Sequence, residues 1–281
     1  MGQTSEDIDR MARLRVTIMG CGSSPGVPRI GNDWGACDPN EPKNRRSRCS
    51  LLIERFGKGD TPTTIVVDTG PDFRTQLLAA RVNHIEGVIY THSHADHIHG
   101  IDDLRAIWQS SKKLVDIYAD APTINRLEQA FGYCFASPAG SFYPPMLKHH
   151  AVEVGAPIKI NGAGGPVEIR TFRQVHGDIV TLGLRVGGLA YSCDISDLPP
   201  ESLDAVRKLD VWIVDALRHR THPSHFSVAE SLDWIGRIKP RRAILTHMHT
   251  DLDYQQLCRD LPDHVAPAYD GMQLELDDEV P

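Results

Sequence analysis

The sequence predicts an α/β fold, and three observations carry that prediction. The chain has 281 residues, of which 41% are hydrophobic, enough for a sizeable core. Runs with β-strand character are mixed with helical runs along most of its length. Side chains able to bind metal follow directly after strands, which is where open α/β sheets place their sites.

The first half of the chain is expected to form a strand-rich unit with three helices. Pro71 suits the first turn of a helix. A glycine-rich segment at 20–26 and a loop from about Val27 to Arg48 separate the first two strands. The predicted strands are Leu14–Met19, Cys49–Phe56, Thr63–Val67, Gly87–Tyr90 and Val115–Ala119, and the predicted helices are Pro71–Arg81, Ile101–Ser110 and Pro122–Phe131.

The second half begins with the least regular stretch, residues 132–166, which we interpret as an excursion over the active face. Strands and helices then resume. The predicted strands are Val167–Gln174, Ile179–Val186, Gly188–Cys193, Val211–Val214, Arg242–Thr246 and Gln273–Leu276, and the predicted helices are Pro200–Lys208 and Ser227–Ile238. Residues 1–12 are expected to be a disordered tail and residues 13–281 a single domain.

Composition excludes several functional classes. No apolar run reaches the roughly 18 residues of a membrane span, and no secretory signal is recognised. Gly2 is followed by Glu6 where an N-myristoylation motif needs Ser or Thr. The six cysteines are scattered without a CxxC pair, so we expect reduced thiols and a cytoplasmic protein. A net charge of −7 argues against tight binding to long nucleic acid.

The segment from 91 to 100 contains the strongest chemical signal, four histidines and an aspartate. Imidazole and carboxylate are ligands that zinc and similar divalent metals prefer. His92 and His94 are two residues apart in an extended segment and point to the same side. Asp96 and His97 follow after the chain turns and are placed to reach a second metal. The alternative is a polar surface loop rich in histidine.

Three further candidate ligands, His176, Asp194 and His247, each end a predicted strand. We expect His92, His94 and His176 to hold one metal. Asp96, His97 and His247 would hold the other, with Asp194 as the bridge. Each of the two ions, zinc or manganese, then keeps an open position for a shared water or hydroxide.

With this ligand set the chain resembles the metallo-β-lactamase fold superfamily, which implies a four-layer αββα sandwich. The HxHxDH motif at 92–97 is that family's most specific signature. Several blocks are similar to the phosphodiesterase branch that includes phosphoribosyl cyclic phosphodiesterase and ribonuclease Z, the former being the closer match. These blocks are Gly20-Cys21-Gly22-Ser23-Ser24-Pro25-Gly26-Val27-Pro28, Asp68-Thr69-Gly70-Pro71-Asp72-Phe73-Arg74, His97-Ile98-His99-Gly100-Ile101-Asp102-Asp103-Leu104 and His222-Pro223-Ser224-His225-Phe226-Ser227.

The resemblance also implies roles for residues around the metals. Asp68 resembles an aspartate that holds a ligand histidine in one tautomer. His225 resembles a histidine beside the scissile phosphate, although it could instead cap the following helix, and Asp215 is expected to hold it or to shape a ligand. His225, Asp194 and Asp96 are therefore the candidate catalytic residues. The other candidates are substrate contacts at His222, Ser23, Ser24, Arg46 and Arg48, and His99 as a support for the ligands.

Two features depart from the family pattern. Relatives carry several cysteines near the start that hold a structural zinc, whereas only Cys37 stands in the corresponding stretch here, with Cys21, Cys49 and His249 as conceivable recruits. The long arm by which ribonuclease Z grips transfer RNA is not recognised in this chain.

The expected function is a binuclear metal-dependent hydrolase, specifically a phosphodiesterase acting on a small cyclic or nucleotide-like phosphodiester through a metal-bridging hydroxide. The alternatives are a thioester or lactone hydrolase of the same fold, a tRNA 3′-processing endonuclease, and a non-catalytic nucleotide-binding protein. No membrane partner is expected, and a homodimer is an expectation by analogy with the family.

Overall fold

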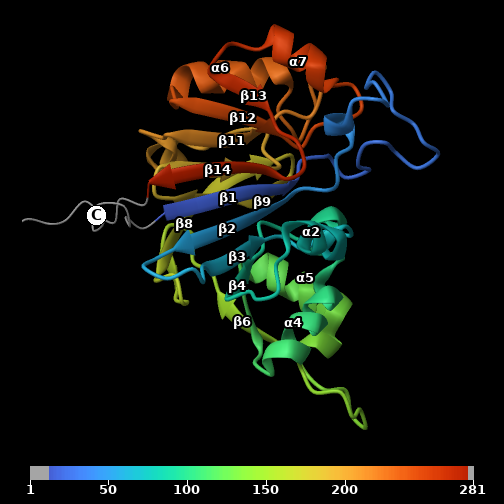
Figure 1. Ribbon diagram of the computed structural model, residues 1–281, viewed down its shortest axis with the longest axis vertical. Coiled ribbons are helices and arrows are strands. Elements are labelled where there is room, and N and C mark those ends of the chain that lie inside the picture. The colour runs from blue at the N-terminus through green and yellow to red at the C-terminus, as the bar shows by residue number, and fades with distance from the viewer. Residues whose placement is uncertain (1–12, 278–281) are drawn as a thin grey trace, which may run out of the picture.

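The computed structural model describes residues 13–277, which form two β-sheets packed face to face with helices on both outer sides (Figure 1). The first sheet has the strand order β14-β1-β2-β3-β4-β5-β6, and the second has the order β13-β12-β11-β10-β9-β8-β7. This is the predicted αββα sandwich. The predicted tail at residues 1–12 lies outside the described residues.

The first sheet combines the strands of the first half of the chain with the last strand. Its members are β1 (Arg13–Gly20), β2 (Ser50–Phe56), β3 (Thr63–Val67), β4 (Gly87–Ile89), β5 (Val115–Ala119), β6 (Leu147–Ala151) and β14 (Met272–Asp277). The second sheet contains β7 (Pro157–Ile160), β8 (Val167–His176), β9 (Ile179–Val186), β10 (Leu189–Ser192), β11 (Val211–Asp215), β12 (Arg242–Thr246) and β13 (Val265–Pro267).

Helices cover the two outer faces. Those of the first half are α2 (Phe73–Ala80), α3 (Ala95–Ile98), α4 (Leu104–Ser111) and α5 (Ala121–Phe131), and those of the second half are α6 (Val228–Ile238) and α7 (Tyr254–Asp260). Short 3-10 turns occur at η1 (Pro42–Asn44), η2 (Ile101–Asp103), η3 (Gly132–Cys134) and η4 (Pro200–Val206). None of the helices within residues 13–277 is long and apolar enough to cross a membrane.

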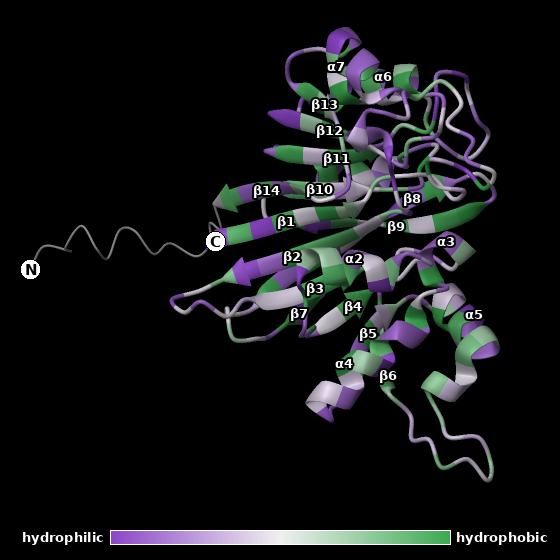
Figure 2. Ribbon diagram, turned by 45° about the vertical axis from the view of Figure 1, so that its right-hand side comes forward, coloured by the Kyte–Doolittle hydropathy of each residue, from purple (hydrophilic) through white to green (hydrophobic). Residues whose placement is uncertain are grey.

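Alternation along the strands explains the layering. In β1, Leu14, Val16 and Ile18 point into the core between the sheets, whereas Met19 joins the core beneath the helices of the first half. Both faces of the first sheet therefore contribute to a core. Figure 2 shows hydrophobic residues, in green, recurring along the strands of both sheets. Since each face is buried against a different layer, the strand register is fixed by two cores rather than one.

Local sequence sets the helix starts. Ser227 caps α6 and forms a capping box with Glu230, and the Asp120 side chain caps α5. The predicted helix at 71–81 begins later, at Phe73, because Pro71 and Asp72 form a turn before it.

The stretch at 132–166 differs from the expectation. It is not an excursion over the active face, since it supplies β6, which pairs parallel to β5, and β7, which pairs antiparallel to β8. These are short edge strands, whose local pattern is weak. The predicted helix Pro200–Lys208 is instead the 3-10 turn η4, and α3, α7 and β13 were not anticipated.

Topology brings the candidate ligands to one edge of the sandwich. β3 and β4 run parallel, as do β10, β11 and β12. β8 and β10 are both antiparallel to β9, so they run in the same direction as each other. The carboxyl ends of these strands lead directly into Asp68, the 91–97 segment, His176, Asp194, Asp215 and His247.

Candidate metal centre

The first group of ligands joins the loop after β4 to the end of β8. The side chains of His92, His94 and His176 converge closely enough to hold one metal ion. His176 Nε2 lies 3.3 Å from His94 Nδ1, and the rings of His92 and His94 are 4.6 Å apart between centroids. His92 and His176 are buried and His94 is exposed, so this site opens to solvent on one side.

The second group combines a residue of α3 with residues that directly follow β10 and β12. His97 Nε2 is 3.1 Å from Asp194 Oδ2, and His247 Nδ1 is 3.4 Å from the same oxygen. Asp96 Oδ2 approaches His97 Nε2 at 3.5 Å. The structure thus brings His97 and His247 to the predicted bridge, while Asp96 lies beside His97 and outside the cluster whose ligand atoms converge.

Asp194 presents one carboxylate oxygen to each group. Its Oδ2 faces His97 and His247, while its Oδ1 lies 3.7 Å from His176 Nε2. Asp194 and His247 both have left-handed backbone (φ of 54° and 57°), which turns the chain sharply at the strand ends. Because such conformations are costly for residues with a Cβ, their occurrence at strand ends in this site is a sign of functional constraint.

The donor set fits divalent cations. His92 Nε2 is buried and has no hydrogen-bond partner, although buried polar atoms are normally satisfied, and the buried His97 Nε2 faces the carboxylates of Asp96 and Asp194. Burial holds the pKa of His92 well below its usual range, which keeps that imidazole neutral and able to bind metal. Burial also disfavours a charged His97, but the carboxylates of Asp194, Asp96 and Asp68 outweigh it and raise the pKa of His97. A cation would replace that proton.

Asp68 orients His97 from the side away from the metal groups. Its Oδ2 accepts a hydrogen bond from His97 Nδ1 at 2.8 Å, and the same carboxylate accepts from the Thr91 amide at 2.8 Å and the Thr91 hydroxyl at 2.7 Å. A proton held on Nδ1 leaves Nε2 as the free lone pair. The placement matches the role that the resemblance implied for Asp68. Thr91 was missed in the sequence, where it is one of many strand-end threonines.

His225 is held beside the metal groups by Asp215. His225 Nδ1 lies 2.7 Å from Asp215 Oδ2, and its other nitrogen, Nε2, is 4.0 Å from Asp194 Oδ1. Asp215 is fully buried, and its Oδ2 also accepts from the Ile195 amide at 3.1 Å. Helix capping is done by Ser227, so the alternative role for His225 is wrong. His222 is half-buried, with its ring 5.2 Å from that of His225.

Three predicted residues do not lie where the prediction needs them. Arg46 is buried, and its guanidinium donates to the carbonyls of Leu252 at 2.7 Å and His249 at 3.3 Å, so it is a structural residue and no phosphate contact. Arg48 pairs with Asp72 at the start of α2 and contacts no candidate ligand. His99 is exposed and packs edge-on against Phe131 instead of supporting a ligand.

The two predicted serines lie beside the His247 loop. The Ser23 amide donates to the Met248 carbonyl at 3.2 Å, and its buried hydroxyl has no hydrogen-bond partner. Ser24 is exposed. Ser23 therefore remains the better placed of the two for a substrate contact.

The structure gives no support to a structural zinc at Cys37. Within residues 13–277, no cluster of three or more potential ligands includes Cys37, Cys21, Cys49 or His249. The Cys37 thiol instead donates to the carbonyls of Thr250 and Leu252. Besides Thr91, Cys193 was missed in the sequence, and it joins His97, Asp194 and His247.

Comparisons with known proteins agree with this fold. A crystal structure of a diphosphatase from the PhnP family superposes with a TM-score of 0.84 and is 32% identical, covering 95% of this chain and 98% of that one. Human short-form tRNase Z shares the fold at 17% identity, with a TM-score of 0.64 and coverage of 92% and 98%. An octanoyltransferase from Porphyromonas gingivalis is 30% identical over 271 residues, but the match spans 94% of this chain and only 52% of that protein.

A family model described as the beta-lactamase superfamily domain matches residues 63–248, which is more than half of the chain. These residues run from β3 to the turn after His247 and include all seven predicted ligands. The fold, the ligand cluster and this match together show that the chain belongs to the β-lactamase superfamily, with the metallo-β-lactamase sandwich fold.

Proposed function

We propose that this protein is a binuclear metal-dependent phosphodiesterase that cleaves a small cyclic or nucleotide-like phosphodiester. The observation that carries the proposal is the Asp215–His225 pair, which directs His225 Nε2 toward Asp194. A thioester releases a thiolate, which needs little help from a proton donor, whereas a phosphodiester with an alkoxide leaving group benefits from a positioned one.

Two cations bound at the groups described above would neutralise phosphate charge and lower the pKa of a water molecule. The protein's own residues then divide the remaining work. Asp68 keeps His97 in the tautomer that leaves Nε2 free, and Asp194 holds the two groups in register.

His225 supplies the proton for the departing oxygen in this scheme. Asp215 stabilises the doubly protonated imidazole through the 2.7 Å contact at Nδ1, and the proton on Nε2 passes to the leaving alkoxide. The histidine ends neutral with its Nδ1 proton retained. His222 and Ser23 are proposed as further substrate contacts, because they lie beside His225 and the His247 loop respectively.

One relative, the PhnP-family structure at 32% identity, favours hydrolysis at phosphorus. The PhnP-family structure is named a diphosphatase, so cleavage of a P–O–P bond by the same site is a second candidate. The octanoyltransferase name refers to a protein about twice as long as the matched region, and we do not extend that activity to this chain. Zinc and manganese both suit a histidine and carboxylate set.

The proposal is tested by substrate class. Apoprotein reconstituted with zinc or with manganese should hydrolyse bis-p-nitrophenyl phosphate and a cyclic ribose or nucleotide phosphate, and the Asp194→Asn variant should lose that turnover. Parallel assays use a dinucleoside diphosphate, a thioester and a lactone. Turnover of the thioester or lactone with none of the phosphate substrates would overturn the proposal, and preference for the diphosphate would favour the second candidate.

A further inference from the structure

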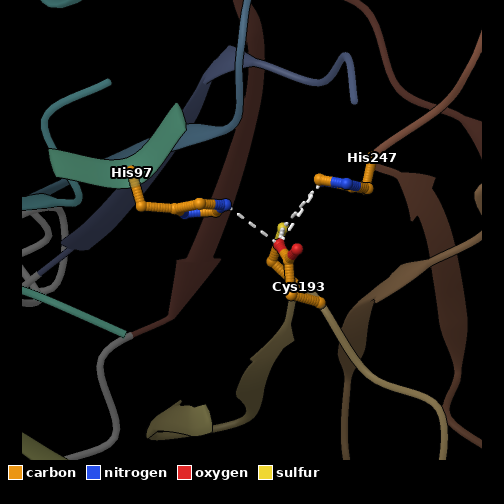
Figure 3. Close-up of side chains that lie close together, drawn as sticks. His97, Cys193 and His247 are labelled. Atoms are coloured by element: carbon orange, nitrogen blue, oxygen red, sulfur yellow. Dashed lines mark hydrogen bonds and ion pairs between the residues drawn. The ribbon is translucent and has the colours of Figure 1, made fainter. Parts of the chain in front are cut away.

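Cys193 lies directly against His97, Asp194 and His247, the second group of ligands, but takes no part in the proposed reaction. Its Sγ is 2.9 Å from Asp194 Oδ2 and 3.5 Å from His247 Nδ1. The ligand atoms of His97, Cys193, Asp194 and His247 all lie within 4.8 Å of one another, and all four side chains are buried. Figure 3 shows His97, Cys193 and His247 pointing toward one another from three different segments.

The backbone explains why two consecutive residues reach the same point. In a strand, Cys193 and Asp194 would point to opposite faces of the sheet. Asp194 has a φ of 54°, in the left-handed region, so the alternation ends after β10 and both side chains face the group.

The donor atoms are spaced nearly as in a tetrahedral site, except for one shorter contact. Zinc–nitrogen bonds near 2.0 Å and zinc–sulfur bonds near 2.3 Å place neighbouring ligand atoms about 3.3 to 3.6 Å apart. The separations here are 3.1 Å from His97 Nε2 to Asp194 Oδ2, 3.4 Å from His247 Nδ1 to that oxygen, and 3.5 Å from His247 Nδ1 to Cys193 Sγ, while Sγ lies closer, 2.9 Å, to Asp194 Oδ2. The sulfur therefore lies among the ligand atoms, and an ion between them would have to move Sγ and Oδ2 apart by about 0.6 Å.

The surroundings of Cys193 suit a coordinated sulfur. The side chain is 1% exposed, and Cys49, also buried, is in hydrogen-bond contact with it. A thiol next to a metal-bound sulfur can donate to it, as groups around metal ligands commonly do. The competing explanation is that the Cys193 thiol only donates a hydrogen bond to Asp194 Oδ2.

We propose that Cys193 is a sulfur ligand of the cation held by His97, Asp194 and His247. The inference rests on the proposed metal centre. When the sulfur–metal bond forms, the thiol proton is released to solvent, and the ligand becomes a thiolate. Soft sulfur favours zinc, cobalt or cadmium, so this position binds manganese more weakly than those ions, whereas the His92–His94–His176 position distinguishes less between the two classes.

Cobalt gives a direct test, because a cobalt–thiolate bond produces an intense near-ultraviolet charge-transfer band that nitrogen and oxygen ligands do not. The experiment uses a Cys258→Ser background, which removes the exposed thiol, and cobalt is the only metal added. We expect the band to grow with one equivalent of cobalt and to be absent from the Cys193→Ser variant. Serine keeps the hydrogen bond to Asp194 while removing the sulfur. Cys134→Ser, a buried thiol in the helical core of the first half, is the matched control and keeps the band.

Metal competition gives a second readout. Cys193→Ser should weaken cadmium binding at one site by at least roughly tenfold while leaving manganese binding unchanged. Two bound cobalt ions without the band, or a band that survives in Cys193→Ser, would overturn this inference and leave the binuclear centre intact. Failure to bind any cobalt would overturn the metal centre itself.

Discussion

Replacing Asp68 by asparagine exchanges one carboxylate oxygen for an NH2 group and should weaken metal binding by His97, which Asp68 orients through a hydrogen bond at Nδ1. Oδ1 of Asp68 faces the fixed amide hydrogen of Thr91, so the asparagine oxygen must stay there. Its NH2 group then takes the place of Oδ2, against His97 Nδ1. Two donors cannot face each other, so His97 adopts the tautomer with its proton on Nε2, the nitrogen 3.1 Å from Asp194.

The expected cost follows from the role of such partners. Loss of the group that orients a ligand histidine typically lowers metal affinity 10- to 100-fold, which is about 1.4 to 2.7 kcal/mol. Competition with a fluorescent chelator measures the affinity of each of the two sites. Only the second, which contains His97, should weaken, while the site of His92, His94 and His176 keeps its affinity.

Asp102→Asn provides the charge-matched control, because it removes the same charge from an exposed aspartate that pairs with Arg105. It should bind both ions as the wild type does. If Asp68→Asn also bound both ions with wild-type affinity, the tautomer argument would be refuted.

Three further predictions follow from the same geometry. His225→Ala should slow hydrolysis of an alkyl phosphodiester by about 10²-fold or more, yet hardly affect p-nitrophenyl esters, whose leaving group needs no proton; equal losses for both would exclude proton donation. In the apoprotein, burial lowers the pKa of His247 but the Asp194 charge outweighs it and raises that pKa to about 10. The contribution of His247 to the stability of the apoprotein is therefore complete below the unfolded pKa near 6.5 and is lost as the pH rises through 10. Because zinc replaces the His247 proton, zinc binding at pH 7 should release protons, which calorimetry detects as an enthalpy that depends on the buffer. Arg46→Ala should lower the free energy of unfolding in urea by about 3 kcal/mol, because it leaves buried carbonyls without donors, whereas the exposed Arg45→Ala should cost under about 0.5 kcal/mol.

The sandwich and the ligand cluster could be predicted because their signals are local. His176, Asp194 and His247 lie at or just after strand ends, and the HxHxDH motif places the other four ligands within six consecutive residues. The strands that precede His176, Asp194 and His247 run in the same direction and bring these three residues to one edge. Predicting this requires only the directions of the strands. The Asp215–His225 pair is harder, since ten residues and a loop separate its members.

The misjudged residues depend on contacts that are distant in sequence. Arg46 stands in the densest run of positive charge, yet its partners are carbonyls about 200 residues further along the chain. Nothing near Arg46 indicates that such a loop will fold back and bury it. The position of Cys193 could not be predicted for a related reason. Alternation along a strand would point Cys193 and Asp194 to opposite faces, whereas the left-handed backbone at Asp194 turns both side chains toward the same group. The edge strands β6 and β7 have too few residues to show a period.

A titration of apoprotein with zinc, followed by hydrolysis of a cyclic phosphodiester at each point, tests the two-metal phosphodiesterase most directly. Activity should stay low through the first equivalent and rise to its maximum as the second binds, because Asp194 joins both groups. Full activity at one equivalent, or none at two, would contradict a binuclear phosphodiesterase.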